Sequence, residues 1–262
     1  MLEGAGEALW LTLSRRWYAV GFFAAYLLAA VRHLGWRRTA ALTVVGYLTA
    51  WASEACSIRT GFPYGWYAYL WQPAEPLGLD PREPALWGVP CFDSLSYVFI
   101  AYASLAMALY VLGVPPGRRT APAVTLATAV LFVTVDVVID PVALRGERWF
   151  LGKIYTYPGG GAHFGVPLSN YAGWLLVGAV IAGAFQLLDR WLGPPGGRGR
   201  RAGPGAGALL YLAVHAFGIG VAWWIGEREL ALASLGIALP LAALVAARRA
   251  LGEPPAAGAG AA

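Results

Sequence analysis

Two aspartates stand four residues apart at the end of an apolar run in the middle of the chain. Asp136 lies within the apolar stretch 121–139, Asp140 comes directly after it, and Pro141 closes it off. On a helix this spacing places both carboxyl groups on one face. A carboxylate at membrane depth costs about 2.5–3.5 kcal/mol on insertion scales, which makes such a pair a functional-site hypothesis. The alternative is a hydrated pair neutralised by Arg145 or Arg148.

Two carboxyl groups at close range in apolar surroundings store a proton. Like charge and desolvation prevent both from ionising easily, so one stays protonated near neutral pH. The chemistry that this favours is proton transfer to a lipophilic alkene, which gives a tertiary carbocation that aromatic faces can stabilise. Water then captures the cation, and the ionised partner accepts a proton from that water. We therefore predict a hydration that needs neither a metal nor an organic cofactor.

Three further polar residues stand at the ends of apolar stretches. Glu54 lies near the end of one stretch, Asp93 at the start of the next, and Asn170 at the start of a later one. Glu54 is either functional or paired with Arg59. Asp93 is more typical of an acid favoured by a helix macrodipole, which indicates a structural role. An amide such as that of Asn170 can position both a carboxyl group and a water molecule. We assign Glu54 and Asn170 to the predicted catalytic set.

The elements that position these residues are predicted membrane helices. The chain of 262 residues is 58% hydrophobic and only 13% charged, with a mean hydropathy of +0.57. This composition predicts an all-α polytopic membrane helix bundle. About seven stretches approach the roughly 20 residues that a span needs: 17–31, 39–58, 92–112, 121–139, 168–188, 207–225 and 230–247. We expect one transmembrane domain over residues 1–251, a linker at 193–207 and a disordered tail at 252–262.

Alternation of seven spans brings the ends that carry the polar residues to one membrane face. The other face receives 11 of the 19 Lys and Arg residues, which indicates that it is the cytoplasmic face. The expected location is the inner membrane of a prokaryotic cell. The net charge of +5 reflects this anchoring, and no nucleic-acid partner is expected. Two long loops, 59–91 and 141–167, open on the first face and are rich in aromatic residues. Some anchor the helices, and others are predicted to line a pocket.

Several segments resemble a known family. The resemblance lies in Asp140-Pro141, in Trp149, in Gly61-Phe62-Pro63-Tyr64-Gly65-Trp66-Tyr67 after Glu54, and in Phe164-Gly165-Val166-Pro167-Leu168-Ser169-Asn170 before Trp174. These segments are similar to the membrane carotenoid-biosynthesis proteins that include the CruF-type carotenoid hydratases. Two positions depart from that pattern. His163 stands where an aromatic residue is expected, and Ser96-Tyr97 where a tryptophan is expected.

The resemblance implies an enzyme that adds water to the terminal double bond of an acyclic carotenoid end group. The expected partners are the carotenoid substrate and the lipid bilayer. The aromatic residues assigned to substrate binding are Tyr64, Trp66, Tyr67, Trp149, Phe164 and Trp174. Three alternatives stay open. They are a prenyltransferase that holds magnesium and diphosphate, a carotenoid cyclase that excludes water after the same protonation, and a carotenoid-binding protein without catalysis.

Overall fold

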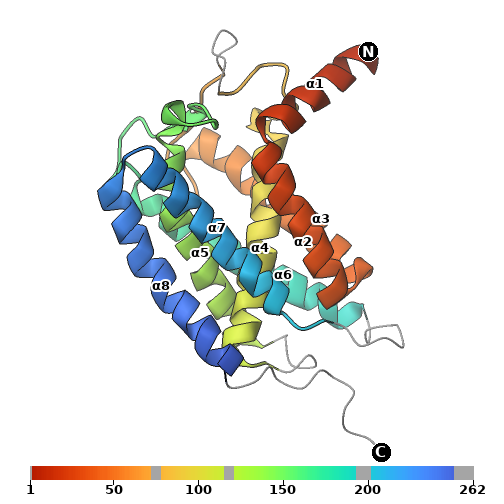
Figure 1. Ribbon diagram of the computed structural model, residues 1–262. Helices are drawn as coiled ribbons and strands as arrows, with labels where there is room; N and C mark the ends of the chain where they lie inside the picture. Colours follow the sequence, from red (N-terminus) through yellow and green to blue (C-terminus); the bar gives the residue numbers. More distant parts are fainter. Residues whose placement is uncertain (1, 72–77, 115–120, 193–201, 251–262) are drawn as a thin grey trace, which may run out of the picture.

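The computed structural model describes residues 2–71, 78–114, 121–192 and 202–250, and these form a helical bundle (Figure 1). The predicted tail and most of the predicted linker lie outside the described residues. The helices are α1 (Leu2–Arg15), α2 (Trp17–Leu34), α3 (Trp36–Thr60), α4 (Cys91–Leu112), α5 (Pro122–Ala143), α6 (Leu168–Trp191), α7 (Gly205–Trp224) and α8 (Arg228–Ala250).

The helices α2 to α8 correspond to the seven predicted spans. Within the described residues, six of them are long and apolar enough to cross a membrane: α2, α4, α5, α6, α7 and α8. The exception is α3, which is 25 residues long but includes Arg37, Arg38, Glu54 and Arg59. The prediction of an all-α polytopic bundle is confirmed. Helix α1 was not predicted, because its 14 residues precede the first apolar stretch.

Helix α4 is the centre of the bundle (Figure 1). It packs against α2, α3, α5, α7 and α8, and most of its residues are buried. A helix that is apolar all round, as α4 is, is typically buried on every side. The three acids and the amide of the predicted site lie on its neighbours α3, α5 and α6, so α4 fixes the distance between them.

Helices α5 and α6 form another close pair. Gly178 of α6 faces Phe132 of α5, and a Cβ atom at Gly178 would stand 2.8 Å from the Phe132 ring. The missing side chain therefore lets the two helices approach closely. This contact brings the start of α6, with Asn170, next to the end of α5, with Asp136 and Asp140.

The two long loops pair with each other across the top of the bundle (Figure 1). Strand β1 (Ala68–Tyr69) pairs antiparallel with β4 (Tyr155–Thr156), and Tyr69 stands opposite Tyr155. A second small hairpin joins β2 (Ala85–Leu86) to β3 (Val89–Pro90). The short 3-10 helix η2 (Gly146–Arg148) follows α5. Loop aromatics that are 86 residues apart in the sequence are thereby placed side by side.

Buried ion pairs fix the first long loop to the N-terminal helices. Arg16, between α1 and α2, is almost fully buried and donates to both carboxylate oxygens of Glu83, at 3.1 and 2.8 Å. It also donates to the carbonyl oxygens of Gly78 and Leu151, at 2.5 and 2.8 Å. One arginine therefore connects both long loops to the start of the first span.

Candidate active site

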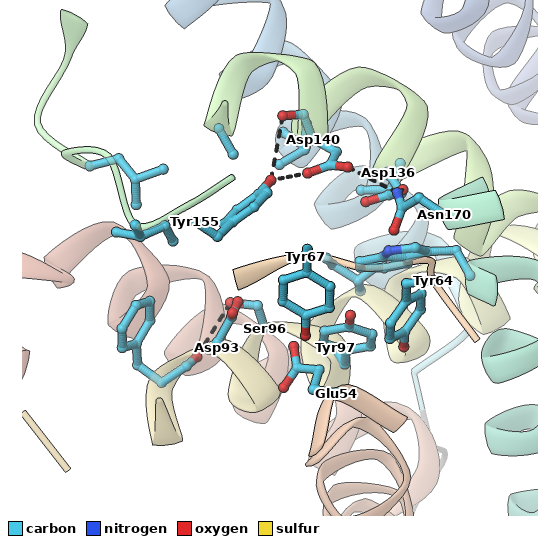
Figure 2. Close-up of a pocket in the computed structure, with 18 of the residues that line it drawn as sticks. Glu54, Tyr64, Tyr67, Asp93, Ser96, Tyr97, Asp136, Asp140, Tyr155 and Asn170 are labelled. Carbon is cyan, nitrogen blue, oxygen red and sulfur yellow. Dashed lines mark hydrogen bonds between the residues drawn. The ribbon is translucent and has the colours of Figure 1, made fainter. Parts of the chain in front are cut away.

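A cavity of about 150 Å³ lies beneath the paired loops, between the ends of the helices (Figure 2). Its walls come from α2 to α7 and from the two long loops. Four acidic side chains line it, namely Glu54, Asp93, Asp136 and Asp140, and we refer to them as the cavity acids. Asn170 lines it as well. The structure therefore brings together the four residues that were predicted to converge, namely Glu54, Asp136, Asp140 and Asn170.

Asp136, Asp140 and Asn170 form a hydrogen-bonded group at one side of the cavity. The Asn170 amide nitrogen Nδ2 donates to Asp136 Oδ2 at 2.6 Å and to Asp140 Oδ2 at 2.9 Å. All three side chains are at least 95% buried. Asn170 lies in the first turn of α6, which begins after Pro167, and its backbone N–H bonds to the Pro167 carbonyl at 3.0 Å. The amide thus bridges the two carboxyl groups.

Two phenols from the second loop also donate to Asp140. The Tyr157 hydroxyl bonds to Asp140 Oδ2 at 2.9 Å. The Tyr155 hydroxyl bonds to Asp140 Oδ1, as Figure 2 shows. Burial, followed by the charge of Asp140, raises the pKa of Tyr157 well above its usual range. Tyr157 therefore stays protonated and acts as a donor. The sequence does not indicate that either tyrosine belongs to the site, because the pairing of β1 with β4 is what turns them toward Asp140.

Glu54 and Asp93 form a second acidic group on the opposite side of the cavity (Figure 2). Ser94 donates to Glu54 Oε2 at 2.8 Å, and Tyr69 donates to Asp93 Oδ2 at 2.6 Å. Burial, and then the charge of Asp93, raises the pKa of Tyr69 well above its ordinary value. Asp93 stands in the first turn of α4, as the helix-macrodipole interpretation expects, and it also lines the cavity. In the sequence, the feature that indicated a place for Asp93 in the site was its position at a span end on the same membrane face as Glu54.

In the described part of the chain, no arginine or lysine forms an ion pair with any cavity acid. Arg145 bonds instead to Glu227 at 2.9 Å and to the Pro141 and Phe164 carbonyls. Arg148 also pairs with Glu227. The alternative in which Arg145 or Arg148 neutralises the aspartates is therefore wrong.

Glu54 is likewise not paired with Arg59, which donates to the carbonyls of Ala55 and Trp87. The cavity acids consequently face only neutral hydrogen-bond donors among the described residues. A carboxylate that lacks a cation in such a site is costly to ionise.

Aromatic rings form the rest of the cavity wall. Tyr67 lies at the middle of a tyrosine cluster, with ring centroids 5.4 Å from Tyr69, 6.2 Å from Tyr155 and 6.1 Å from Tyr157. The electron-rich faces of such rings attract a cation. The cluster lies between the two acidic groups, where it could stabilise positive charge on a bound molecule.

The two departures from the family pattern have clear positions. Tyr97 lines the cavity and stacks on Trp174, with centroids 4.4 Å apart. His163 lies outside the cavity lining, where its Nδ1 is 2.5 Å from the Tyr171 hydroxyl. Tyr97 therefore occupies the place of the expected tryptophan as an aromatic wall.

Four of the six aromatic residues that sequence analysis assigned to substrate binding line the cavity: Tyr64, Tyr67, Trp149 and Trp174. Trp66 does not, because 62% of its surface is exposed and its ring lies against Gly61. Phe164 also lies outside the lining, in a turn with φ +51° whose carbonyl is held by Arg145. Loop residues have no periodicity that indicates their direction, so the sequence could not separate these two from the others.

Metal binding would require several ligand side chains to converge on one point. Within the ranges that the structure describes, no group of three or more His, Cys, Asp or Glu side chains has the arrangement of a metal site. Asp136 and Asp140 share an amide donor, and Asp140 also receives phenol hydroxyls. These contacts occupy carboxylate oxygens with hydrogen-bond donors.

The fold and cavity define an integral membrane protein with a buried acidic site in an aromatic pocket, and the described lining of this pocket contains no arginine or lysine. Residues 15–242 match the model of the carotenoid biosynthesis protein family, and the chain belongs to this family. Over 161 residues the chain is 33% identical to bisanhydrobacterioruberin hydratase of Haloarcula japonica. The matched part is 61% of this chain and 49% of that protein, so the chain spans about half the length of this relative. No solved structure matches the chain.

Proposed function

We propose that this protein is a carotenoid hydratase that adds water to the terminal carbon–carbon double bond of an acyclic carotenoid end group. The observation that carries the proposal is the set of four cavity acids, which face tyrosines and an amide instead of arginines. Membership of the carotenoid biosynthesis family and the similarity to a hydratase support it. The organism of that relative also supports a prokaryotic cell membrane as the setting.

The Asp136–Asp140 pair is the proposed acid. Two carboxyl groups bridged by one amide share a proton more easily than they hold two negative charges. Transfer of that proton to the less substituted carbon of a trisubstituted double bond leaves a tertiary carbocation. The tyrosine cluster around Tyr67 stabilises this cation through its ring faces.

Water completes the reaction. Its oxygen atom bonds to the tertiary carbon, and one of its protons passes to a carboxylate, so the sum is an alkene plus water giving a tertiary alcohol. Asn170 is the proposed positioning group for this water, because its amide already bridges the aspartates. Glu54 and Asp93, across the cavity, are the second proposed proton acceptors. Asp93 enters this set from its position in the structure.

The size of the cavity agrees with a reaction at the end of a long molecule. Cavities of about 150 Å³ in proteins hold a molecule of about six carbon atoms. One isoprene end group has this size, whereas a whole carotenoid is several times larger. The alternatives differ in what the site must hold. A cyclase must exclude water from its site, whereas the polar side chains of this cavity attract water. A prenyltransferase binds a diphosphate, which favours cationic side chains, and the described cavity lining lacks them.

Product analysis tests the proposal. Expression in a host that accumulates lycopene or γ-carotene should give a pigment heavier by one water mass, read by mass spectrometry. In heavy water, one deuterium should appear on the carbon next to the new tertiary alcohol. Exhaustive chelation should leave the activity unchanged. A cyclised product of unchanged mass would favour the cyclase, and chelator-sensitive prenylation would favour the prenyltransferase.

A further inference from the structure

A second hollow lies on the outer surface of the bundle, between α3 and α6. Its volume is about 480 Å³, and its lining is almost entirely apolar. Leu48 and Ala52 line it from α3, Leu176 and Val180 from α6, and Phe62 from the first loop. We call it the α3–α6 groove. Its outer residues face the region where lipid surrounds the protein, since Leu48, Leu176 and Val180 are exposed.

The groove and the cavity meet at Tyr64. This side chain is 99% buried and lines the cavity, while its hydroxyl lies 2.8 Å from the hydroxyl of Ser53, which lines the groove. Pro63 lines the groove next to Tyr64 in the chain. The two hollows are therefore separated by the Pro63–Tyr64 segment where it passes between α3 and α6.

That segment packs directly on α6 because Gly173 has no side chain. A Cβ atom at Gly173 would stand 2.6 Å from the Tyr64 ring and 2.7 Å from the Pro63 carbonyl oxygen. Ser169, one turn earlier, donates to the Tyr64 carbonyl at 3.1 Å. The segment that separates the groove from the cavity is thus held by close packing on α6 and by the hydrogen bond between Tyr64 and Ser53 of α3.

The groove offers an apolar surface for part of a polyene chain. The α3 residues from Leu48 to Cys56 extend along the membrane for about 12 Å at 1.5 Å per residue. The cavity holds only about one isoprene unit. The rest of an extended hydrocarbon must therefore lie outside the cavity, in contact with an apolar surface that adjoins it.

We propose that the α3–α6 groove binds the polyene chain of the substrate next to the end group that occupies the cavity. This inference rests on the proposed function, because it takes the substrate to be a long acyclic isoprenoid. It assigns chain-length selectivity to the groove and leaves the chemistry to the cavity. The end group enters past Tyr64, and this side chain must turn aside because it closes the wall between the two hollows.

Substitutions that fill the groove test this. Ala52→Trp and Val180→Trp each place a large ring in the hollow, at exposed positions that line the groove and not the cavity. Leu187→Trp is the matched control, because it lies on α6 with 58% of its surface exposed but outside the groove lining. Hydration is measured on a full-length acyclic carotenoid and on a ten-carbon acyclic alkene with the same end group.

We expect kcat/KM for the carotenoid to fall at least tenfold in both groove variants and to change less than twofold for the short alkene. The control should match the native protein on both substrates. An equal loss on both substrates would overturn the proposal, and so would an equal loss in the control. No loss at all would also overturn it and would indicate that membrane lipid occupies the groove.

Pigment retention separates this inference from the proposed function. The native protein and the three tryptophan variants are purified from a carotenoid-producing host, and bound pigment is measured by absorption. Lower retention in the groove variants alone supports the groove even when no hydration is detected. Equal retention in all four proteins contradicts the groove, whatever the activity.

Discussion

Buried acids occur in two kinds of surroundings in this protein, and the contrast separates support from chemistry. Asp80, Glu83 and Asp189 lie outside the cavity, and each pairs with arginine: Arg15 and Arg82 with Asp80, Arg16 with Glu83, and Arg38 with Asp189. We call them the arginine-paired acids. The cavity acids have only hydroxyl and amide donors among the described residues.

The two groups have opposite energetic consequences. A buried carboxylate that is paired with arginine and hydrogen-bonded recovers much of its desolvation cost, and losing one partner leaves the other uncompensated. A carboxylate without a cation is held at a cost to stability, which is the common situation of functional residues. The comparison predicts that changes in the first group affect stability and that changes in the cavity affect activity.

The largest effect is expected for Asp136→Asn and Asp140→Asn. An amide can neither donate the acidic proton nor accept one, so hydration should fall by about 10³-fold or more. Thermal stability should be kept or increased, because a desolvated acid is replaced by a neutral group of the same shape. Pigment analysis in the host and a thermal unfolding scan measure the two effects. Activity within tenfold of the native value at both positions would refute the acid assignment.

Arg16→Met should affect stability instead. It leaves Glu83 buried without its partner, and breaking such a pair costs about 3–5 kcal/mol. The folded fraction should hydrate its substrate within twofold of the native rate. Arg82→Met serves as the control, and it should change stability less, because the Arg82 side chain is 57% exposed and its buried partner Asp80 keeps its ion pair with Arg15. A strong loss of specific activity in Arg16→Met with unchanged stability would contradict the division between the groups.

Glu54→Gln and Asp93→Asn test the second side of the cavity. If these acids accept the proton from water, each variant should lower kcat by about 10²-fold with little change in KM. Both proteins should still insert and fold. Steady-state kinetics with a carotenoid in detergent would measure this. Unchanged kcat in both would reassign the pair to packing around Tyr67 and Tyr69.

Tyr155→Phe and Tyr157→Phe each remove one hydroxyl donor from Asp140. A hydrogen bond to a charged group contributes about 1.5–3 kcal/mol, so each change should reduce hydration roughly tenfold or more. Tyr171→Phe is the control, because its hydroxyl bonds to His163 outside the cavity. A decrease of the same size in the control would show that the tyrosine positions matter only for folding.

The smallest effect concerns pH and the arginine-paired acids. Hydrogen bonds from Arg82 lower the pKa of Asp80 to about 2. A depressed carboxyl pKa stabilises the folded state above its unfolded value of about 3.9, and this contribution is lost as the pH falls toward 2. Asp80→Asn should lower the melting midpoint by a few degrees at pH 6, and the difference should shrink at pH 3. Glu147→Gln, at an exposed position, should show no such dependence.

Much of the helical framework could be predicted from the sequence, because it depends on local properties. Apolar stretches long enough for a membrane span fix where the helices lie, and six of the seven expected spans meet both criteria of length and apolarity. The positions of Glu54, Asp136 and Asn170 at span ends, combined with alternation across the membrane, also predicted that they converge. Each of these inferences needs only the period of a helix and the thickness of a bilayer.

Only the tertiary structure decided which loop residues enter the cavity. The pairing of β1 with β4 turns Tyr155 toward Asp140 and brings Tyr67 and Tyr69 beside it, whereas Trp66, one residue before Tyr67, faces outward. The arginine pairings are equally nonlocal, as in Arg16 with Glu83, and within the described ranges none of them includes a cavity acid. Short strands and loops have no strong periodicity, so the direction of their side chains follows from contacts between distant parts of the chain.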